Sequence, residues 1–215
     1  MKLMTYARGA LLALGPVHFA PAADITTTTG PGNTFEVSAT DLINRGQDTL
    51  GSPVQTVGSE AFGSSLSKLN DGVTYDGKGS TLAGGNSATG FCTSDRAVVL
   101  VTLSGSATGY DISSVISLTA YNDPSRVGQE YDLSVHTVGA APGVFVSIAN
   151  PNFAADGKIE RQVIITGTGK APLASAVDQL QFTFRDALTG VGDGNRFESV
   201  YHEIDVLGKP HVADE

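Results

Sequence analysis

The sequence contains one cysteine, Cys92, and no tryptophan among its 215 residues. A single cysteine excludes an intramolecular disulfide, so a secreted domain must depend on a large core or on a bound metal instead. No cluster of cysteine and histidine residues is present that would hold zinc. We expect Cys92 to be a half-buried small apolar residue; a free thiol and a bond to another chain are the alternatives.

Charged residues are also scarce, at 16% of the chain against roughly a quarter in an average protein. This scarcity argues against helical bundles and coiled coils, which are built from Glu, Lys, Ala and Leu. Hydrophobic residues make up 40% of the chain, which is enough to form a core. The remainder is rich in Gly, Ser and Thr, and this composition is typical of an extracellular β-protein.

Basic residues are the rarer kind of charge, since 13 Lys and Arg stand against 22 Asp and Glu, for a net charge of −9. So acidic a surface repels phosphate backbones, and no basic patch interrupts it, so nucleic acid is not expected as a partner. The same charge attracts divalent cations. Long hydrophobic runs are missing too, because the apolar stretch at residues 10–14 is far shorter than the roughly 20 residues of a membrane span.

Residues 1–23 have the pattern of a secretory signal peptide. Lys2 and Arg8 make a positive start, residues 10–14 are apolar, and residues 20–22 read Ala-Pro-Ala, like a cleavage site. A disordered or strand-forming N-terminus is the alternative. The pattern predicts a secreted, extracellular protein, whose mature chain carries 11 basic and 22 acidic residues and a net charge of −11.

Short β-favouring runs follow a polar lead-in at residues 24–33, and turn-forming residues separate them. They predict strands at 34–39, 53–57, 97–104, 110–120, 129–137, 144–149, 159–166, 177–185 and 197–207. Helical turns are expected only at 39–45 and 64–69. About nine short strands in this arrangement predict an all-β fold, an antiparallel β-sandwich of the jelly-roll type, as one domain over 34–208 with a flexible tail at 209–215.

Alternation within three of these strands predicts which residues face the core. Inward positions are expected at Tyr131, Leu133, Val135, Leu180, Phe182, Phe184, Val200, Ile204 and Val206. In the last strand Tyr201, Glu203 and Asp205 are expected to face outward. His136 and His202 are single histidines on strands and are expected at the surface or at an edge.

Residues 58–96 form a long stretch with little periodicity, many glycines and several acids, and such segments are usually functional or held in place by something. Asn70-Asp71-Gly72 and Asp76-Gly77 offer oxygen ligands of the kind that calcium binds in extracellular modules. An ordinary Asx turn is the alternative for the same residues. The acidic turn at 192–195 is expected to be only a turn.

Three stretches together resemble the discoidin-like, galactose-binding-like β-sandwich domains of secreted bacterial proteins. They are LNDGVTYD at 69–76, a strand that begins YDI at 110 and leads to YNDPSR at 121–126, and YHEIDVLG at 201–208. The resemblance implies a galactose-binding-domain-like jelly roll that binds carbohydrate or cell-surface material, as in adhesion, through loops at one end. It also implies a structural calcium ion, whose ligands carry over to Asn70, Asp71, Asp76 and Glu203.

The chain departs from this family in two respects that concern sugar binding. There is no Trp, although relatives often have one at the position of Tyr121, and the His and paired-Arg pattern of the fucose-binding lectins is missing. The loop after the tyrosine-led strand still combines an aromatic ring with hydrogen-bonding side chains. Its candidate ligand-binding residues are Tyr121, Asn122, Asp123 and Arg126. A local Asp123–Arg126 salt bridge that stiffens the Pro124 turn is the alternative.

Catalysis has no positive signal in the sequence. Glu203 and Asp205 are two apart on a strand, but neighbouring carboxylates on one strand point the same way and do not flank a substrate; we expect one metal ligand and one solvated acid. No G-x-S-x-G motif occurs. The sequence therefore predicts a secreted, non-catalytic binding module. A secreted hydrolase acting on polysaccharide and a structural protein of the cell envelope are the alternatives.

Overall fold

A computed structural model describes residues 23–31, 35–38, 40–44, 51–57, 65–72, 91–92, 97–121, 123–185, 187–188, 196–197 and 199–213. Residues 1–22 of the expected signal peptide, Asp76 and Asn122 lie outside these residues, as do the side chain of Cys92 and the acidic turn at 192–195. Neither of the two helices that the described residues form has the length or hydrophobicity to cross a membrane. Both are single 3-10 turns, η1 at Leu66–Leu69 and η2 at Pro124–Arg126.

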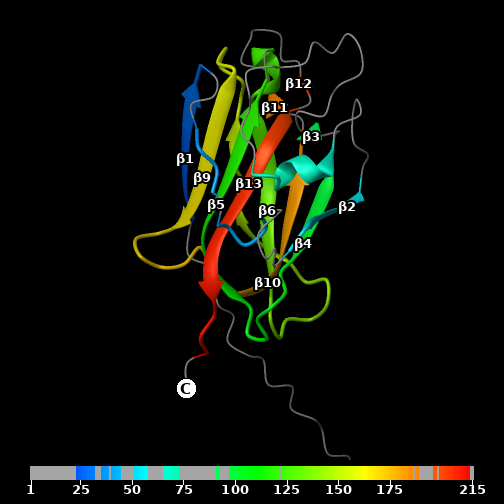
Figure 1. Ribbon diagram of the computed structural model, residues 1–215, viewed down its shortest axis with the longest axis vertical. Coiled ribbons are helices and arrows are strands. Elements are labelled where there is room, and N and C mark those ends of the chain that lie inside the picture. The colour runs from blue at the N-terminus through cyan, green and yellow to red at the C-terminus, as the bar shows by residue number, and fades with distance from the viewer. Residues whose placement is uncertain are drawn as a thin grey trace, which may run out of the picture.

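The strands form two facing layers (Figure 1), and every pairing among the described strands is antiparallel. One layer runs in the order β1 (Ala23–Gly30), β9 (Glu160–Gly167), β5 (Tyr110–Ala120), β13 (Val200–Pro210) and β3 (Phe91–Cys92). The other layer runs in the order β2 (Pro53–Val57), β4 (Val98–Thr102), β10 (Ala174–Phe184) and β6 (Gln129–Thr137). Beyond β6 lie the short strands β7 (Val146–Ala149) and β8 (Asn152–Phe153).

The two layers join at one corner, where the first residues of β10 pair with the first residues of β5. A bulge interrupts this pairing between Ala174 and Val177 and turns β10 from one layer into the other. Ala176, inside the bulge, has a φ of 55°, a conformation that L-residues with a side chain rarely adopt. A separate ribbon pairs β11 (Ala187–Leu188) with β12 (Arg196–Phe197).

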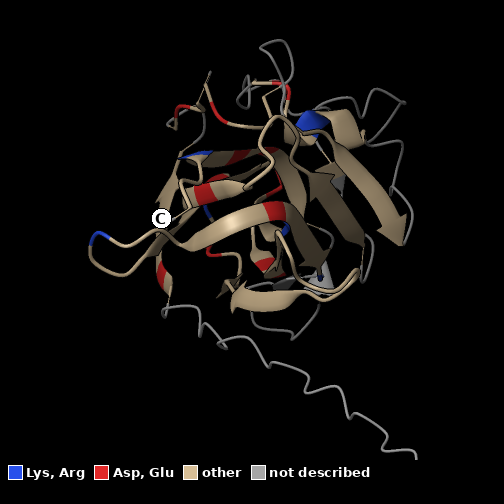
Figure 2. Cartoon of the chain, turned by 90° about the horizontal axis from the view of Figure 1, so that it is seen from below, with Lys and Arg blue, Asp and Glu red and all other residues tan. Residues whose placement is uncertain are grey.

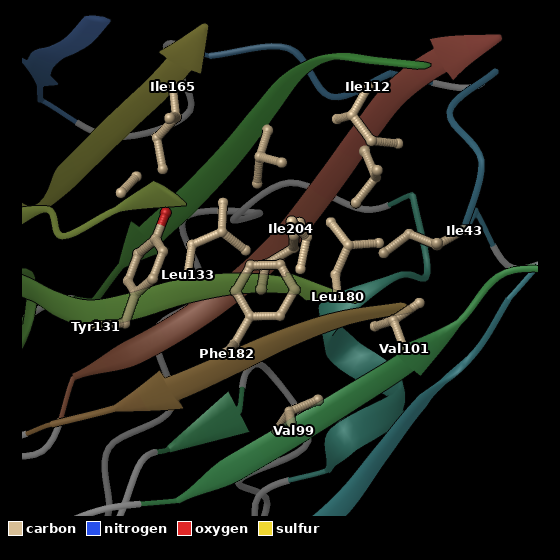
Figure 3. Close-up of a cluster of buried hydrophobic side chains, with 14 of the residues drawn as sticks. Ile43, Val99, Val101, Ile112, Tyr131, Leu133, Ile165, Leu180, Phe182 and Ile204 are labelled. Atoms are coloured by element: carbon tan, nitrogen blue, oxygen red, sulfur yellow. The ribbon is translucent and has the colours of Figure 1, made fainter. Parts of the chain in front are cut away.

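Side chains from both layers fill the space between them with one hydrophobic core (Figure 3). The expected alternation is confirmed in β6 and β10, whose inward residues Leu133, Leu180 and Phe182 are fully buried. The rings of Phe182 and Phe184 stack with centroids 6.0 Å apart, and Tyr201 lies 4.8 Å from Phe184. The all-β antiparallel sandwich that the composition and the periodicity predict is confirmed.

Three expectations near the N-terminus are wrong. The lead-in at 24–33 is mostly strand, because β1 pairs with β9 along its whole length. Its run of threonines lacks clear alternation, yet these β-branched residues suit an edge strand that is half exposed. The strand expected at 34–39 is not formed by the described residues 35–38, and residues 40–44 form a turn where a helical turn was expected.

The faces expected for β13 are partly wrong, because a bulge shifts its register with β5 between Tyr201 and Glu203. The extra residue turns Tyr201 into the core and leaves His202 buried instead of at the surface. Glu203 and Asp205 point away from the core, as expected, but they are buried beneath other parts of the chain. The strand also runs on to Pro210, into the segment expected to be a flexible tail.

The core predicts the effect of removing one ring from it. Phe182→Ala should lower the free energy of unfolding by about 3–5 kcal/mol, because the side chain is fully buried and packs against two other rings. Thr183→Ala, the next residue on the opposite face of β10, should cost about 0.5 kcal/mol or less. Urea unfolding followed by circular dichroism measures both, and equal losses would contradict this description of the core.

Candidate functional site

The loop that follows β5 is organised by Asp123. Its Oδ1 accepts hydrogen bonds from the Ser125 backbone N–H at 3.0 Å and from the Ser125 hydroxyl at 2.6 Å, so the carboxylate caps η2. Pro124 occupies the first position of the turn, where its missing N–H costs nothing. The Arg126 backbone N–H donates to the Asp123 carbonyl at 3.1 Å. These bonds stiffen the Pro124 turn, and the Asp123–Arg126 salt bridge, the alternative interpretation of these residues, accompanies them.

The side chains of this turn differ in how far they reach solvent. Asp123 is half exposed, and its Oδ2 lies 3.8 Å from Arg126 Nε, which is a long ion pair. Tyr121 is only 4% exposed and packs with Val127 and Val200 in a small second cluster. The ring of Tyr121 is thus not an open platform for a ligand. Of the candidate ligand-binding residues that the structure describes, Asp123 offers the most accessible polar group.

A second group of candidate residues lies on the outward face of β13, beneath two loops. Gly72 donates its backbone N–H to Glu203 Oε2 at 3.0 Å, and Ser38 donates its backbone N–H to Asp205 Oδ2 at 2.8 Å. Asp41 lies in the same region, since its Oδ1 accepts from the Val206 backbone N–H of β13 at 3.5 Å as well as from the Ile43 backbone N–H at 2.9 Å. Residues 38 and 40–44, here called segment 38–44, and residues 70–72 therefore cover Glu203 and Asp205, which are 1% and 2% exposed.

Each of these carboxylates keeps one oxygen without a hydrogen-bond partner among the described residues. The oxygens are Asp41 Oδ2, Glu203 Oε1 and Asp205 Oδ1, all buried. A buried carboxylate oxygen without a donor costs free energy unless a proton or a cation neutralises the group. No group of three or more His, Cys, Asp or Glu among the described residues forms a ready-made metal site.

Burial dominates the electrostatics of this region. It raises the pKa of Glu203 to about 9, and repulsion from Asp205 adds to this increase, against the hydrogen bond from Gly72. Burial likewise raises the pKa of Asp205 to about 7, where the Ser38 hydrogen bond opposes it and the charge of Asp41 adds to it. Burial also raises the pKa of Asp41. The expectation that Asp205 is a solvated acid is therefore wrong.

Of the residues expected to bind calcium together with Glu203, the structure describes Asn70 and Asp71, and both are engaged with other groups. Asn70 is buried, and its side-chain amide donates to the Ile43 carbonyl at 2.7 Å. Asp71 is next to Gly72 but pairs with Lys68, whose Nζ lies 2.6 Å from Asp71 Oδ2. Gly72 has a φ of +72°, and a Cβ there would lie 3.2 Å from the Asn44 side-chain amide, so glycine lets this turn approach Glu203.

The sequence did not single out Ser38 or Asp41 as partners of this region. Ser38 is 167 residues away from Asp205 in the chain, and no local pattern indicates such a contact. The only signal was indirect, in that a segment which follows a predicted signal peptide contains an Asp and several hydroxyl residues. Acidic residues occur on strands of both layers and in the loops (Figure 2), so acidity alone does not identify these two carboxylates.

No family model matches this chain, and no curated protein matches it in sequence. Among solved structures it is similar to a family 32 carbohydrate-binding module, CpGH89CBM32-4 of Clostridium perfringens, at 10% identity over 78% of this chain and 98% of that one, with a TM-score of 0.44. A family 32 module of NanJ from C. perfringens, in complex with galactose, shares 16% identity over 86% and 92%, with a TM-score of 0.37.

The family 32 module of AlyQ, in complex with 4,5-unsaturated mannuronic acid, is similar at 13% identity over 57% of this chain and 80% of that one, with a TM-score of 0.36. These TM-scores are below 0.5, and the identities are too low to carry a ligand or a site from one chain to the other. The three structures named here are all family 32 carbohydrate-binding modules.

Proposed function

We propose that this chain is a secreted, non-catalytic module that binds carbohydrate or cell-surface material through the loops at one end of its sandwich. The observation that carries the non-catalytic part of this proposal is the burial of Glu203 and Asp205 beneath segments 38–44 and 70–72. A glycosidase needs its two carboxyl groups on either side of an open cleft. Glu203 and Asp205 accept hydrogen bonds from backbone N–H groups of the covering segments, so they serve to hold the chain together. The loops at the end of the sandwich then remain to contact a ligand.

The turn at 123–126 supports this proposal as the place of contact. Its cap and its proline hold the backbone in one conformation, so little conformational entropy is lost when a ligand binds. Asp123 accepts hydrogen bonds, and Arg126, whose side chain is 14% exposed, donates them, which is the combination that sugar hydroxyls require. The strongly acidic chain disfavours polyanionic glycans, and we therefore expect a neutral glycan as the ligand.

A structural calcium ion between β13 and its covering loops is part of the same proposal. The chemistry of the unpartnered oxygens of Asp41, Glu203 and Asp205 supports such an ion, because calcium binds carboxylate oxygens and would relieve the repulsion between the acids. The three carboxylates do not form a ready-made metal site, so they would have to close around the ion as it binds. Asn70 and Asp71 remain candidate ligands beside them, and Asp71 would first have to leave Lys68. The ion would supply positive charge that fixes segments 38–44 and 70–72 on β13.

Arg126→Met should weaken glycan binding about tenfold or more, because a charge-assisted hydrogen bond is lost while the apolar stem is kept. Arg185→Met is the matched control, since Arg185 also pairs with an aspartate, Asp132, on the open face of the second layer. Titration calorimetry against a neutral glycan selected on an array measures both variants. The ligand assignment is wrong if binding persists in Arg126→Met, or if both variants lose it equally.

Calcium at 10 mM should raise the melting temperature of the full chain by about 3–10 °C over the value in EGTA. This range follows from a dissociation constant of roughly 10⁻⁴–10⁻³ M and from the entropy of unfolding of a domain of this size. Glu203→Gln should remove most of that increase, whereas Asp24→Asn, which deletes an exposed acid of β1, should keep it. An unchanged melting temperature in the wild-type chain would rule the ion out.

Without calcium, stability should fall as the pH rises. The folded chain raises the pKa of Glu203 from 4.5 to about 9, so it holds this proton more tightly than the unfolded chain does. The stabilisation is therefore complete below pH 4.5 and is lost as the pH rises towards 9. Urea unfolding in EGTA across this range should show the decline, and Glu203→Gln should reduce it. A flat profile in the wild-type chain would contradict the burial of this carboxyl group.

A further inference from the structure

His136, near the end of β6, has a protein oxygen atom within hydrogen-bond distance of each of its two ring nitrogens. Nδ1 lies 2.6 Å from Asp178 Oδ1 on the neighbouring strand β10, and Nε2 lies 3.2 Å from the backbone carbonyl of Ala141. The residue is 9% exposed. The ring of Phe145 lies 5.8 Å from the imidazole, so the histidine is enclosed by β10 on one side and by the β6–β7 loop on the other.

The chemistry of the two acceptors determines the charge of the ring. A backbone carbonyl and an ionised carboxylate can accept hydrogen bonds but cannot donate them. Neutral imidazole has one N–H and can satisfy only one of the two, while its other nitrogen turns a lone pair toward the second oxygen. Imidazolium has two N–H groups and satisfies both. The geometry is therefore that of the charged form.

The bond to Ala141 holds the β6–β7 loop, residues 138–145, against the sheet. The loop makes two bonds that stay within the hairpin, from the Ala140 N–H to the Thr137 carbonyl and from the Val144 N–H to the Ala141 carbonyl. Its base is tied to β10 by the Val138 N–H, which donates to the Ala176 carbonyl at 2.8 Å. Nearer the tip, the hydrogen bond between the His136 side chain and the Ala141 carbonyl connects the loop to the sheet.

The surroundings of His136 favour its charge. From β10 the charged group that faces it is Asp178, and the loop contributes backbone groups of Ala140 and Ala141 and the ring of Phe145. The outward groups that precede it on β6 are Ser134 and Asp132, and Asp132 pairs with Arg185. The hydrogen bond to Asp178 raises the pKa of His136 above its ordinary value of 6.5, against the opposing effect of burial.

We propose that His136 is a proton-operated clasp for the β6–β7 loop. When it is charged, it bridges Asp178 and Ala141 and fixes the loop; when it is neutral, it keeps Asp178 and releases Ala141. The clasp is closed at acidic pH and opens as the pH rises through the titration of His136. The loop lies at the lower end of the sandwich in Figure 1 and presents Val138 and Val144 to solvent, so the clasp controls how these apolar side chains are held.

A second histidine at the same end of the sandwich provides the control. His211 Nδ1 lies 2.7 Å from Asp111 Oδ1, and its backbone N–H donates to the Gly109 carbonyl at 2.9 Å. This pair ties the chain after β13 to the start of β5 and touches no part of the β6–β7 loop that the hydrogen bonds describe. Its loss should leave the clasp unchanged.

The test follows the ring and the loop separately by nuclear magnetic resonance in the full chain. At pH 6 both ring nitrogens of His136 should carry protons, and the midpoint of its titration should lie above 6.5. The backbone order parameters of residues 139–144 should be about 0.85 at pH 6 and should fall toward about 0.6 above that midpoint. In Asp178→Asn the midpoint should move down by about one pH unit, and the loop transition should move with it.

His136→Gln should abolish the pH dependence of the loop, whereas His211→Gln should keep it. Circular dichroism establishes first that each variant is folded, and Asp178→Asn carries the test if His136→Gln is not. The proposal is overturned if the loop responds to pH equally in wild type and His136→Gln, if the ring has one protonated nitrogen at pH 6, or if the midpoint in Asp178→Asn does not move.

Discussion

The placement of β13 inside the protein on both of its faces is the constraint on which the rest of the structure depends. Every residue from Val200 to Val206 is buried. The inward side chains Ile204 and Val206 belong to the core, and the outward carboxylates of Glu203 and Asp205 lie beneath chain segments from the N-terminal third of the sequence. Removing a carboxylate from water costs more than a single backbone hydrogen bond returns. The carboxylates therefore hold these segments on β13, and their burial is at the same time the main electrostatic cost of this arrangement.

The hydrogen bonds to these carboxylates connect distant parts of the chain, as disulfides do in many secreted domains. The bonds from Ser38 to Asp205 and from Gly72 to Glu203 close loops of 167 and 131 residues. The Leu42 N–H donates to the Val206 carbonyl at 2.8 Å, so the segment also covers an edge of β13 that would otherwise be open to pairing with another chain. Ile43 and Leu69 enter the core from the same two segments. Apolar anchors thus offset the cost of burying the neighbouring acids.

Sequence patterns predicted the parts of this fold that are set by local alternation. Leu180 and Phe182 were assigned correctly because one face of β10 is buried over its whole length. Tyr201 and His202 were assigned wrongly because a bulge adds one residue and reverses the alternation, and nothing in the neighbouring residues signals it. Glu203 was identified through a family resemblance, not through its own pattern. Its environment depends on Ser38 and Asp41, which lie far away in the chain, so local reasoning had no means of placing it.

The two titrating regions respond to pH in the same direction but for opposite reasons. Burial disfavours the charge of Glu203, while hydrogen bonding to Asp178 favours the charge of His136, so a proton stabilises the folded arrangement at each site. A cation can replace the proton at Glu203, because the carboxylate needs only positive charge. It cannot replace the proton at His136, because the clasp needs a second N–H to reach Ala141. Calcium would therefore separate the two pH responses. With calcium bound, the segments that cover β13 would no longer respond to pH, whereas the β6–β7 loop at the lower end of the sandwich still would.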